Sequence, residues 1–470
     1  MRDREVETEH SLKLNGEKLR YSATTGQLVL RAESGEAKAA IFYVYYRKDG
    51  DEDPEDRPIT FIFNGGPGSS SVWLHLGAFG PRRVVLPPPG EHNAPLYRLT
   101  NNPHTLLGAS DLVFLDPVST GFSRAAEVSK AGNFHGLRAD IKVVGDFIRL
   151  FLSRKNRWAS PKFLAGESYG TTRAAGLVQH LQQEHGMYFS GVVLISSVLD
   201  FQTLSFDRGN DLPYVLILPT YTATAWYHSQ LGQEEQNLSL EEVVEKAAEF
   251  AMGDYATALL KGDALGAAER RNIVEQLQRF TGLSQEFLEA SQLRVSTRRF
   301  CKELRRTERR TVGRLDSRFS GMDYDAAGES YEYDPSYAAI LGPFSTAMNQ
   351  YLQEELEYTS DLPYEILNSR VHPWKFESAE NRYATTADLL RQAMTQNPRL
   401  RVFAASGYYD LATPFVASRY TFNHLGLDPT LRRHLQHKSY PAGHMMYIHG
   451  PSHEALRKDL LAFFQSALGL

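Results

Sequence analysis

A short glycine–serine motif is the strongest candidate for chemistry in this chain. Gly166-Glu167-Ser168-Tyr169-Gly170 follows the apolar run 162–165 and precedes residues 171–178, which can continue as a helix. A strand, G-x-S-x-G and a helix together form a nucleophile elbow, a sharp turn that exposes the serine hydroxyl. The two glycines matter because larger residues would collide with the adjacent strand and helix. The motif therefore predicts a nucleophilic Ser168.

A serine nucleophile needs a general base and an acid that orients the base. In chains with a nucleophile elbow these partners come later in the sequence, the acid first and then the histidine, on loops after late strands. The strand-like run 401–405 leads into Asp410, and His444 lies just before the last helix-like segment. We therefore expect Ser168, Asp410 and His444 to form a catalytic triad.

Three other residues compete for these positions. Asp200 also follows a strand-like run, so it could hold the acid position that some variants of this arrangement use, or it could be a helix cap or loop residue. Asp116, before Pro117, is interpreted as a structural turn residue, and His449 as a residue on the approach to the closing helix. Asp410 and His444 remain the favoured pair.

An acyl-transfer site also needs two backbone N–H groups that stabilise the developing oxyanion. One donor is expected from Tyr169, the residue after the nucleophile. The other is expected from the loop 64–68, where three glycines and Asn64 follow the strand-like run 59–63. Glycine allows a close backbone approach, and we predict Gly66 as this second donor.

The elements that must position these residues are short apolar strands alternating with helices. Strand-like runs cover 59–63, 111–115, 192–195 and 401–405, and helical periodicity covers 136–152 and 453–468. This alternation indicates an α/β fold with a mostly parallel sheet. Near the N-terminus, 19–24, 27–31 and 39–47 predict antiparallel edge strands, the first two separated by Thr25-Gly26.

A long insertion separates the two parts of this pattern. Residues 201–400 are mostly helix-like, notably 240–260, 265–281, 284–308 and 344–355, and they have apolar faces of their own. We expect 1–200 with 401–470 to form the α/β core and 201–400 to form a helical cap over it. The arginine-rich segment 298–314 is either a solvated helix face or a positive lining that steers a carboxylate-bearing substrate.

Composition excludes several classes of protein. A net charge of -5, with 42% hydrophobic and 23% charged residues, gives no basic excess for binding nucleic acid. No apolar run approaches the ~18 residues of a membrane span, and no H-E-x-x-H metal motif is present. Cys301 is the single cysteine, which excludes an intrachain disulfide and predicts a packed, inert thiol. The N-terminus lacks the apolar segment of a signal peptide, which predicts a cytoplasmic protein, or a periplasmic or secreted one if such a peptide was removed.

Taken together and in order, these segments resemble the serine carboxypeptidase family (peptidase S10), and among its members the bacterial type. The matching blocks are Asn64-Gly65-Gly66-Pro67-Gly68-Ser69-Ser70, Asn102-Pro103, Leu115-Asp116-Pro117-Val118-Ser119-Thr120-Gly121-Phe122-Ser123, Gly166-Glu167-Ser168-Tyr169-Gly170, Ser406-Gly407-Tyr408-Tyr409-Asp410 and Gly443-His444-Met445. The resemblance implies an α/β-hydrolase fold and release of C-terminal residues from peptides, favoured at acidic pH, with no metal or other cofactor. It also implies that Asn64, Gly65 and Glu167 bind the free C-terminal carboxylate of the peptide substrate.

That last role has a physical basis. A carboxylate would repel Glu167 unless Glu167 is protonated, in which case it donates a hydrogen bond. One departure from the family bears on this role: Ala78 stands where the family often has a second glutamate before Gly-Pro. An esterase or acyltransferase, and a non-catalytic binding protein, therefore stay as alternatives, and both a monomer and a homodimer remain open.

Overall fold

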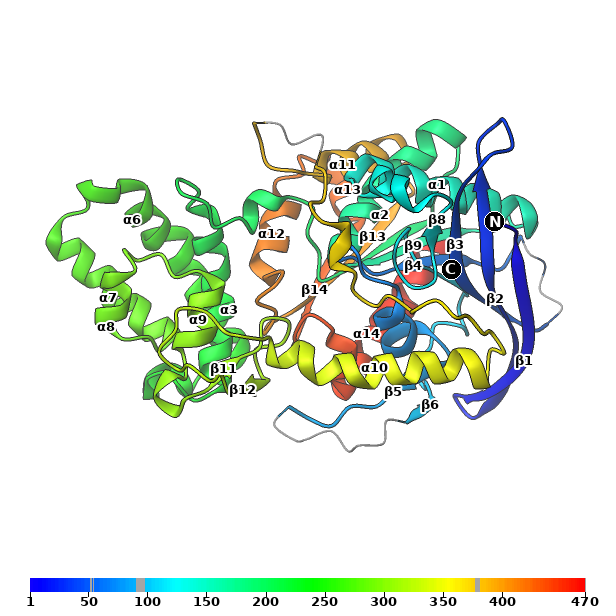
Figure 1. The fold of residues 1–470 in the computed structure, drawn as a ribbon. Helices are drawn as coiled ribbons and strands as arrows, with labels where there is room; N and C mark the ends of the chain where they lie inside the picture. The colour runs from blue at the N-terminus through cyan, green and yellow to red at the C-terminus, as the bar shows by residue number, and fades with distance from the viewer. Residues whose placement is uncertain (51–52, 54, 90–97, 377–380, 470) are drawn as a thin grey trace.

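A twisted sheet forms the centre of the computed structural model, which describes residues 1–50, 53, 55–89, 98–376 and 381–469 (Figure 1). Within this part of the chain the strand order is β1-β2-β3-β7-β4-β9-β10-β13-β14, with β8 paired to β3. The bounds are Arg4–Leu14 for β1, Glu17–Arg31 for β2, Ala37–Lys48 for β3, Ile59–Phe63 for β4, Asp111–Leu115 for β7, Arg124–Ala125 for β8, Lys162–Glu167 for β9, Gly191–Ile195 for β10, Arg401–Gly407 for β13 and Leu435–Tyr440 for β14. The strands from β7 to β14 are parallel, and β1, β2, β3 and β7 pair antiparallel.

The fold is therefore the expected α/β-hydrolase fold, because helices cover both faces of a mostly parallel sheet. One face packs against α1 (Leu137–Arg154), α2 (Tyr169–His185) and α11 (Ala387–Gln396). The other packs against α10 (Pro335–Glu354), α14 (Gly450–Leu468) and the π-helical segment η1 (Leu74–Phe79). The central strands β4, β7 and β10 have every residue buried, as strands covered on both faces require.

The register of the sheet places the candidate site residues at one edge. Phe63 at the end of β4 lies opposite Gly166, Glu167 at the end of β9 lies opposite Ile195, and Ile195 lies opposite Ala405. The carboxyl ends of these strands therefore meet, and the loops that follow them carry the polar residues. Ligands bind outside this edge in open α/β sheets.

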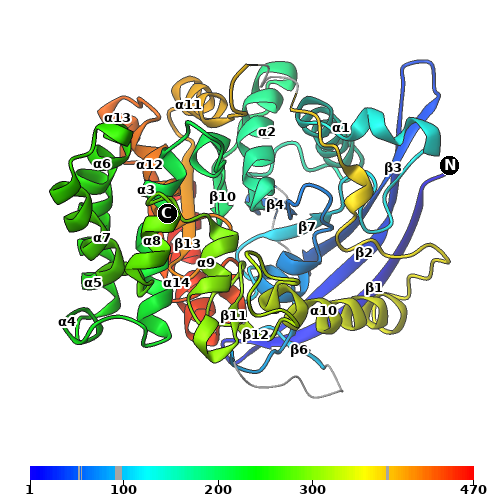
Figure 2. The same cartoon turned by 60° about the vertical axis from the view of Figure 1, so that its left-hand side comes forward.

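A helical lobe lies beside the sheet, at the left of Figure 1, and Figure 2 turns it toward the viewer. It contains α3 (Leu212–Tyr227), α4 (Gln233–Gln236), α5 (Leu240–Phe250), α6 (Ala256–Lys261), α7 (Ala267–Thr281), α8 (Gln285–Ala290) and α9 (Thr297–Glu303). Helices α3, α6, α7, α8 and α9 share a core of their own around Tyr221 and Phe300, whose rings stack at 3.8 Å. Cys301 is buried in the same core.

The expected cap range 201–400 contains two helices that pack elsewhere. Residues of α10 belong to the core beneath the sheet, and residues of α11 belong to the core on its other face. We therefore propose that the cap corresponds to the lobe α3–α9, with the short hairpin β11 (Thr311–Val312) and β12 (Ser320–Gly321) beside it.

Three expected boundaries differ from the structure. The predicted turn at Thr25-Gly26 lies inside the continuous strand β2, because Gly26 lets β1 approach: a Cβ there would lie 2.2 Å from the Arg4 carbonyl oxygen. The expected helix 284–308 is broken into α8 and α9, with Gln292 and Leu293 at positive φ between them. The expected helix 344–355 starts earlier, at Pro335, because Asp334 caps it by accepting the N–H groups of Ser336 and Tyr337.

The remaining helices and strands are short. They are α12 (Phe415–Asn423), α13 (Pro429–Arg432), β5 (Arg82–Val84) and β6 (Leu99–Asn101). In the part of the chain that the structure describes, no helix combines the length and apolar character needed to cross a membrane.

Candidate active site

Ser168 occupies the sharp turn between β9 and α2 that the elbow motif predicts. Its backbone has φ 58° and ψ -129°, a conformation that non-glycine residues rarely adopt and that costs energy to maintain. The turn is tight on both sides: a Cβ on Gly166 would lie 2.2 Å from the Gly170 carbonyl oxygen. The two glycines of the motif therefore allow the backbone contacts that hold the serine at the top of the sheet.

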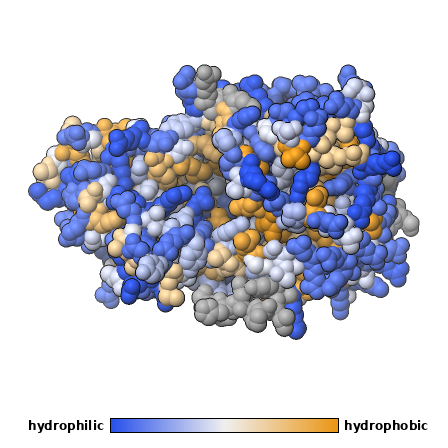
Figure 3. All heavy atoms as spheres, viewed as in Figure 1, coloured by the Kyte–Doolittle hydropathy of each residue, from blue (hydrophilic) through white to orange (hydrophobic). Residues whose placement is uncertain are grey.

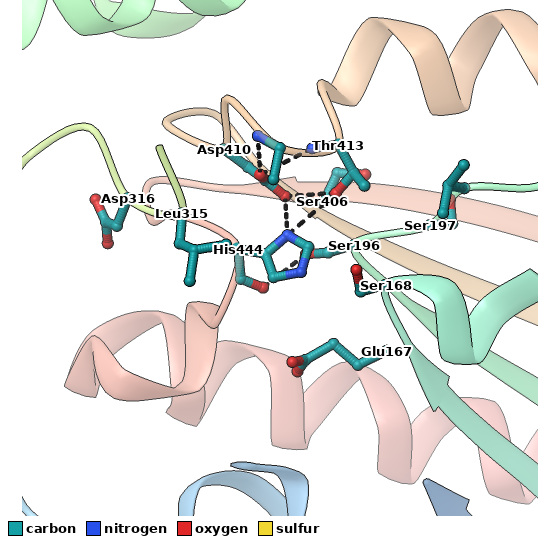
Figure 4. Close-up of polar contacts among 12 residues, drawn as sticks. Glu167, Ser168, Ser196, Ser197, Leu315, Asp316, Ser406, Asp410, Thr413 and His444 are labelled. Atoms are coloured by element: carbon teal, nitrogen blue, oxygen red, sulfur yellow. Dashed lines mark hydrogen bonds and ion pairs between the residues drawn. The ribbon is translucent and has the colours of Figure 1, made fainter. Parts of the chain in front are cut away.

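Asp410 and His444 meet at the same edge of the sheet. The Asp410 Oδ2 atom lies 2.7 Å from His444 Nδ1 and also accepts the Thr413 hydroxyl at 2.6 Å. Asp410 Oδ1 accepts the backbone N–H groups of Ala412 and Thr413, so the fully buried carboxylate is well hydrogen-bonded. Figure 4 shows the His444 ring facing Asp410 on one edge and Ser168 on the other.

The backbone of His444 is also fixed. Its N–H donates to the Leu315 carbonyl at 2.7 Å, and its carbonyl accepts the Ser196 hydroxyl at 2.6 Å. Burial by itself would lower the pKa of His444, but the charge and hydrogen bond of Asp410, together with Glu167, raise this pKa above its usual value. The imidazole is thus held in one orientation and made more basic, as a general base requires.

The glycine-rich loop after β4 lies against the elbow. A Cβ on Gly65 would lie 2.5 Å from the backbone nitrogens of both Tyr169 and Gly170, so only glycine permits this approach. Gly66 has φ 100°, which also favours glycine. The backbone of this loop and the first turn of α2 therefore lie side by side. The two expected oxyanion donors, Gly66 and Tyr169, line the same pocket.

A buried arginine braces this contact. Arg173 on α2 donates to the Asn64 carbonyl at 2.7 Å and to Asp140 of α1 at 2.8 Å. Its guanidinium also lies over the rings of Phe63 and Tyr169. Sequence reasoning missed this residue, because its partners come from three separate segments and no local pattern connects them.

Glu167 is buried beside Ser168, with a side chain directed toward the space below His444 (Figure 4). Its Oε1 atom accepts a hydrogen bond from Asn64 Nδ2 at 2.9 Å, and Oε2 has no hydrogen-bond partner among the described residues. Burial is the main reason that the pKa of Glu167 rises to about 7. The Asn64 side chain is itself fixed, because its Oδ1 accepts the Leu74 N–H at 3.0 Å.

Tyr447 is a second residue that the sequence did not single out. Its ring packs over Gly77 in η1, where a Cβ would lie 2.5 Å from the ring carbon Cε2. Its fully buried hydroxyl faces Glu167 and Asn64, without a well-aligned hydrogen bond among the described residues. A buried hydroxyl, not a second carboxyl, is therefore the group that faces Glu167 from this side.

The competing residues have structural contacts. Asp200 caps a short helical turn by accepting the Gln202 N–H at 3.0 Å, as the cap interpretation predicts. His449 pairs with the Ser452 hydroxyl at 2.8 Å at the start of α14. Asp116 is buried and accepts the Ser71 N–H at 2.8 Å, and burial raises its pKa to about 7.

The site opens into a cavity of about 490 Å³ between the sheet edge, α10 and the segments that lead into and out of the lobe. All eight predicted site residues except Asp410, which lies behind His444, line it. Much of the remaining wall is apolar or aromatic, and includes Trp73, Phe201, Leu204, Leu315, Tyr331, Tyr337, Ile340 and Met445. Figure 3 shows apolar residues gathered near the middle of this face of the molecule.

The arrangement matches a known family. A model described as serine carboxypeptidase matches residues 18–450. The chain belongs to the serine carboxypeptidase family. The match includes both the elbow and the loops of Asp410 and His444, so it covers the site and every strand of the sheet from β3 onward.

Similar curated proteins come from plants and fungi. Serine carboxypeptidase-like 1 of Arabidopsis thaliana is 27% identical over 201 residues, 39% of this chain and 43% of that protein. A carboxypeptidase Y homolog of Arthroderma benhamiae is 34% identical over 131 residues, 27% of this chain and 24% of that protein. These alignments span less than half the length of either relative. The expected bacterial type stays a prediction.

One solved structure shares the overall fold. It is Kex1Δp, a prohormone-processing carboxypeptidase from Saccharomyces cerevisiae, with a TM-score of 0.58 and 17% identity, covering 94% of this chain and 91% of that one. At this identity the likeness supports the α/β-hydrolase fold alone.

Proposed function

We propose that this protein is a serine carboxypeptidase that releases C-terminal residues from peptides through an acyl-enzyme, favoured at acidic pH. The observation that carries the proposal is the 2.7 Å contact of His444 with Asp410, on the far side of the ring from Ser168, with buried Glu167 next to the nucleophile. Ser168, His444 and Asp410 together can perform acyl transfer, and Glu167 provides recognition of a free carboxyl terminus.

In the first half of the reaction, Ser168 Oγ attacks the scissile carbonyl carbon while His444 Nε2 accepts the hydroxyl proton. The N–H groups of Gly66 and Tyr169 stabilise the oxyanion that forms. The tetrahedral intermediate then collapses, the C–N bond breaks, and His444 returns its proton to the leaving amine. Asp410 stabilises the protonated imidazole during both transfers.

In the second half, water attacks the acyl-enzyme carbonyl and gives a proton to His444. The C–O bond to Ser168 breaks, and His444 reprotonates the serine oxygen. The shortened peptide leaves with a new carboxyl terminus. The reaction therefore balances with one water molecule consumed and with Ser168 and His444 returned to their starting states.

Asn64, Gly65 and Glu167 are proposed to bind the C-terminal carboxylate of the substrate. Glu167 can donate a hydrogen bond to it only when protonated, and its pKa of about 7 makes the protonated form available in mild acid. Its Oε2 atom, which lacks a partner among the described residues, is the atom that can carry this proton.

The test compares an N-blocked dipeptide acid with the same dipeptide amide. We expect the acid to be cleaved and the amide to be cleaved at least about 100-fold more slowly, since the amide cannot make the carboxylate contacts. The Ser168→Ala variant should lose at least about a thousandfold in kcat. Equal turnover of acid and amide would exclude the exopeptidase activity.

A second candidate is an esterase or acyltransferase on the same acyl-enzyme. It is favoured by Ala78, which is buried and places no second carboxyl group beside Glu167. Turnover of esters, or acyl transfer to an alcohol, with no cleavage of dipeptide acids would support it. Failure of a fluorophosphonate to label Ser168 in the folded protein would instead support a binding protein.

A further inference from the structure

Arg314 is an exposed residue in the wall of the catalytic cavity, and its backbone is tied to both loops of the candidate triad. Its carbonyl accepts the N–H of Leu411, the residue after Asp410, at 3.1 Å. The next residue, Leu315, accepts the His444 N–H through its carbonyl at 2.7 Å. The base of the Arg314 side chain is therefore fixed relative to the catalytic residues although it follows the lobe in sequence.

The guanidinium of Arg314 makes no hydrogen bond in the part of the chain that the structure describes. Asp334 accepts the Arg314 backbone N–H at 3.1 Å, and it also accepts the N–H groups of residues 315, 336 and 337 and the Ser336 hydroxyl. Among the described residues no ion pair involves the Arg314 guanidinium. Its charge opposes protonation of the His444 imidazole, but Asp410 and Glu167 outweigh this effect and the pKa of His444 stays raised.

Other arginines in the segment 298–314 are paired away from the cavity. Arg299 pairs with Glu329, Arg305 with Glu308 and Arg306 with Glu303. Of the seven arginines of this segment, Arg314 lines the catalytic cavity. The expected positive lining therefore stays a prediction for Arg314 alone, because Arg299, Arg305 and Arg306 have partners elsewhere.

The surroundings of Arg314 in the cavity are mostly apolar and aromatic, and include Leu315, Tyr331 and Tyr337. The two acids in the cavity wall have contacts with groups other than Arg314: Glu167 Oε1 accepts from Asn64, and Asp334 caps the start of α10. An arginine fork without a partner in such a wall suits a carboxylate, which it can bind through two parallel hydrogen bonds.

We propose that Arg314 forms a carboxylate-binding subsite for the C-terminal residue of the substrate. The inference rests on the proposed carboxypeptidase activity and deepens it by naming a recognition residue outside the family resemblance. The carboxylate can be the terminal one or the side chain of a C-terminal Asp or Glu. Both have the same chemistry, and the substrates below distinguish them.

The experiment compares Arg314→Gln, Arg314→Lys and, as a matched control, Arg271→Gln, an exposed arginine of α7 that is not in the cavity wall. The substrates are N-blocked dipeptides ending in Leu, Gln and Glu, and the Leu dipeptide amide. We expect Arg314→Gln to lower kcat/KM for at least one acid by about 10- to 100-fold, and Lys to restore part of it.

The pattern of losses identifies the carboxylate. Equal losses for Leu, Gln and Glu with an unchanged amide assign Arg314 to the terminal carboxylate, whereas a loss confined to Glu assigns it to an acidic side chain. The proposal is overturned if every substrate stays within about twofold of wild type. It is also overturned if Arg271→Gln causes the same loss, because general attraction of anions would then explain it.

A binding measurement separates this proposal from the proposed function. Free leucine, glutamate and leucinamide are tested for slowing of fluorophosphonate labelling of Ser168, which requires no peptide hydrolysis. We expect the amino acids to protect wild type more than Arg314→Gln, and leucinamide to protect both alike. If wild type cleaves no dipeptide but shows this difference, the carboxypeptidase proposal fails and the subsite stands. If free leucine and glutamate slow the labelling of wild type and Arg314→Gln equally, the proposed subsite is overturned.

Discussion

At the scale of the residue, Glu167 and His444 set opposite requirements on pH. The proposed recognition of a carboxylate needs protonated Glu167, whose pKa is about 7, mainly because of burial. The proposed chemistry needs neutral His444, whose pKa is raised despite its burial because Asp410 and Glu167 favour the charged form. The pH profile of activity on free C-termini should therefore be bell-shaped: activity falls on the acidic side as His444 is protonated and on the alkaline side as Glu167 ionises.

We expect Glu167→Gln to remove the alkaline limb for a blocked dipeptide acid. In wild type, kcat/KM should fall as pH rises through about 7, by about tenfold per unit once Glu167 is ionised. In the variant an uncharged amide replaces the titrating group, so activity at acidic pH is retained and that fall disappears. A pH profile of kcat/KM for both proteins measures this.

Asp116 supplies the control for this prediction, because its pKa is also raised to about 7 by burial and it does not line the cavity. Asp116→Asn should keep the alkaline limb. A limb that is unchanged in Glu167→Gln, or lost in Asp116→Asn, would contradict the role proposed for Glu167.

At the scale of the element, the site depends on the contact between the loop after β4 and the start of α2. Because glycine has no side chain, Gly65 can lie directly against the backbone of Tyr169 and Gly170. Arg173 then ties the same loop to α2 and α1 through Asn64 and Asp140. Both expected oxyanion donors lie in these two segments, so their spacing is set by this packing.

We expect Gly65→Ala to lower kcat/KM by at least about 100-fold, the usual effect of losing one oxyanion donor. The added Cβ would sit 2.5 Å from two backbone nitrogens, so the loop and the elbow must move apart, at a cost of about 1–3 kcal/mol in stability. Steady-state kinetics and thermal unfolding measure both effects. Gly132→Ala is the control, because a Cβ there meets nothing within 4 Å. Wild-type kinetics for Gly65→Ala would show that the contact is not needed.

At the scale of the whole molecule, the helical lobe is a second packed unit joined to the catalytic edge. Its core around Tyr221 and Phe300 is separate from the two cores that cover the sheet. Leu411, next to Asp410, is the residue of the late loops that enters this lobe core. A smaller core joins α3 and α5 of the lobe to Tyr409 and α12. We therefore expect the core around Phe300 to unfold by itself and still affect the loop of Asp410.

We expect Phe300→Ala to destabilise the lobe by about 3–5 kcal/mol, the usual range for deleting a buried aromatic ring. Hydrogen exchange should become faster in α3, α7 and α9 and stay unchanged in β9 and β10. Leu260→Ala, in the same lobe at a residue that is 84% exposed, should change neither. Faster exchange in the lobe and the sheet together would mean that the molecule unfolds as one unit.

The sequence by itself determined the parts of the protein that depend on short-range geometry. The elbow, the glycine loop and the strands 59–63 and 111–115 follow from steric limits and from apolar runs, and the structure has these two strands with the same bounds. The order of acid and base after the elbow also predicted that Asp410 and His444 lie together. Each follows a parallel strand, and the carboxyl ends of parallel strands meet at one edge of the sheet.

Only the tertiary structure decided which groups surround Glu167 and the cavity. Tyr447, Arg173 and Arg314 reach the site through contacts between segments far apart in sequence, and no local periodicity marks such contacts. The pKa of Glu167 likewise depends on burial, which all the surrounding layers produce together. The break before α9 was missed for the same reason: buried contacts, such as the Tyr221 hydroxyl on the Val295 carbonyl, override local helix patterns. The start of α10 depends instead on a local cap, Asp334 before Pro335.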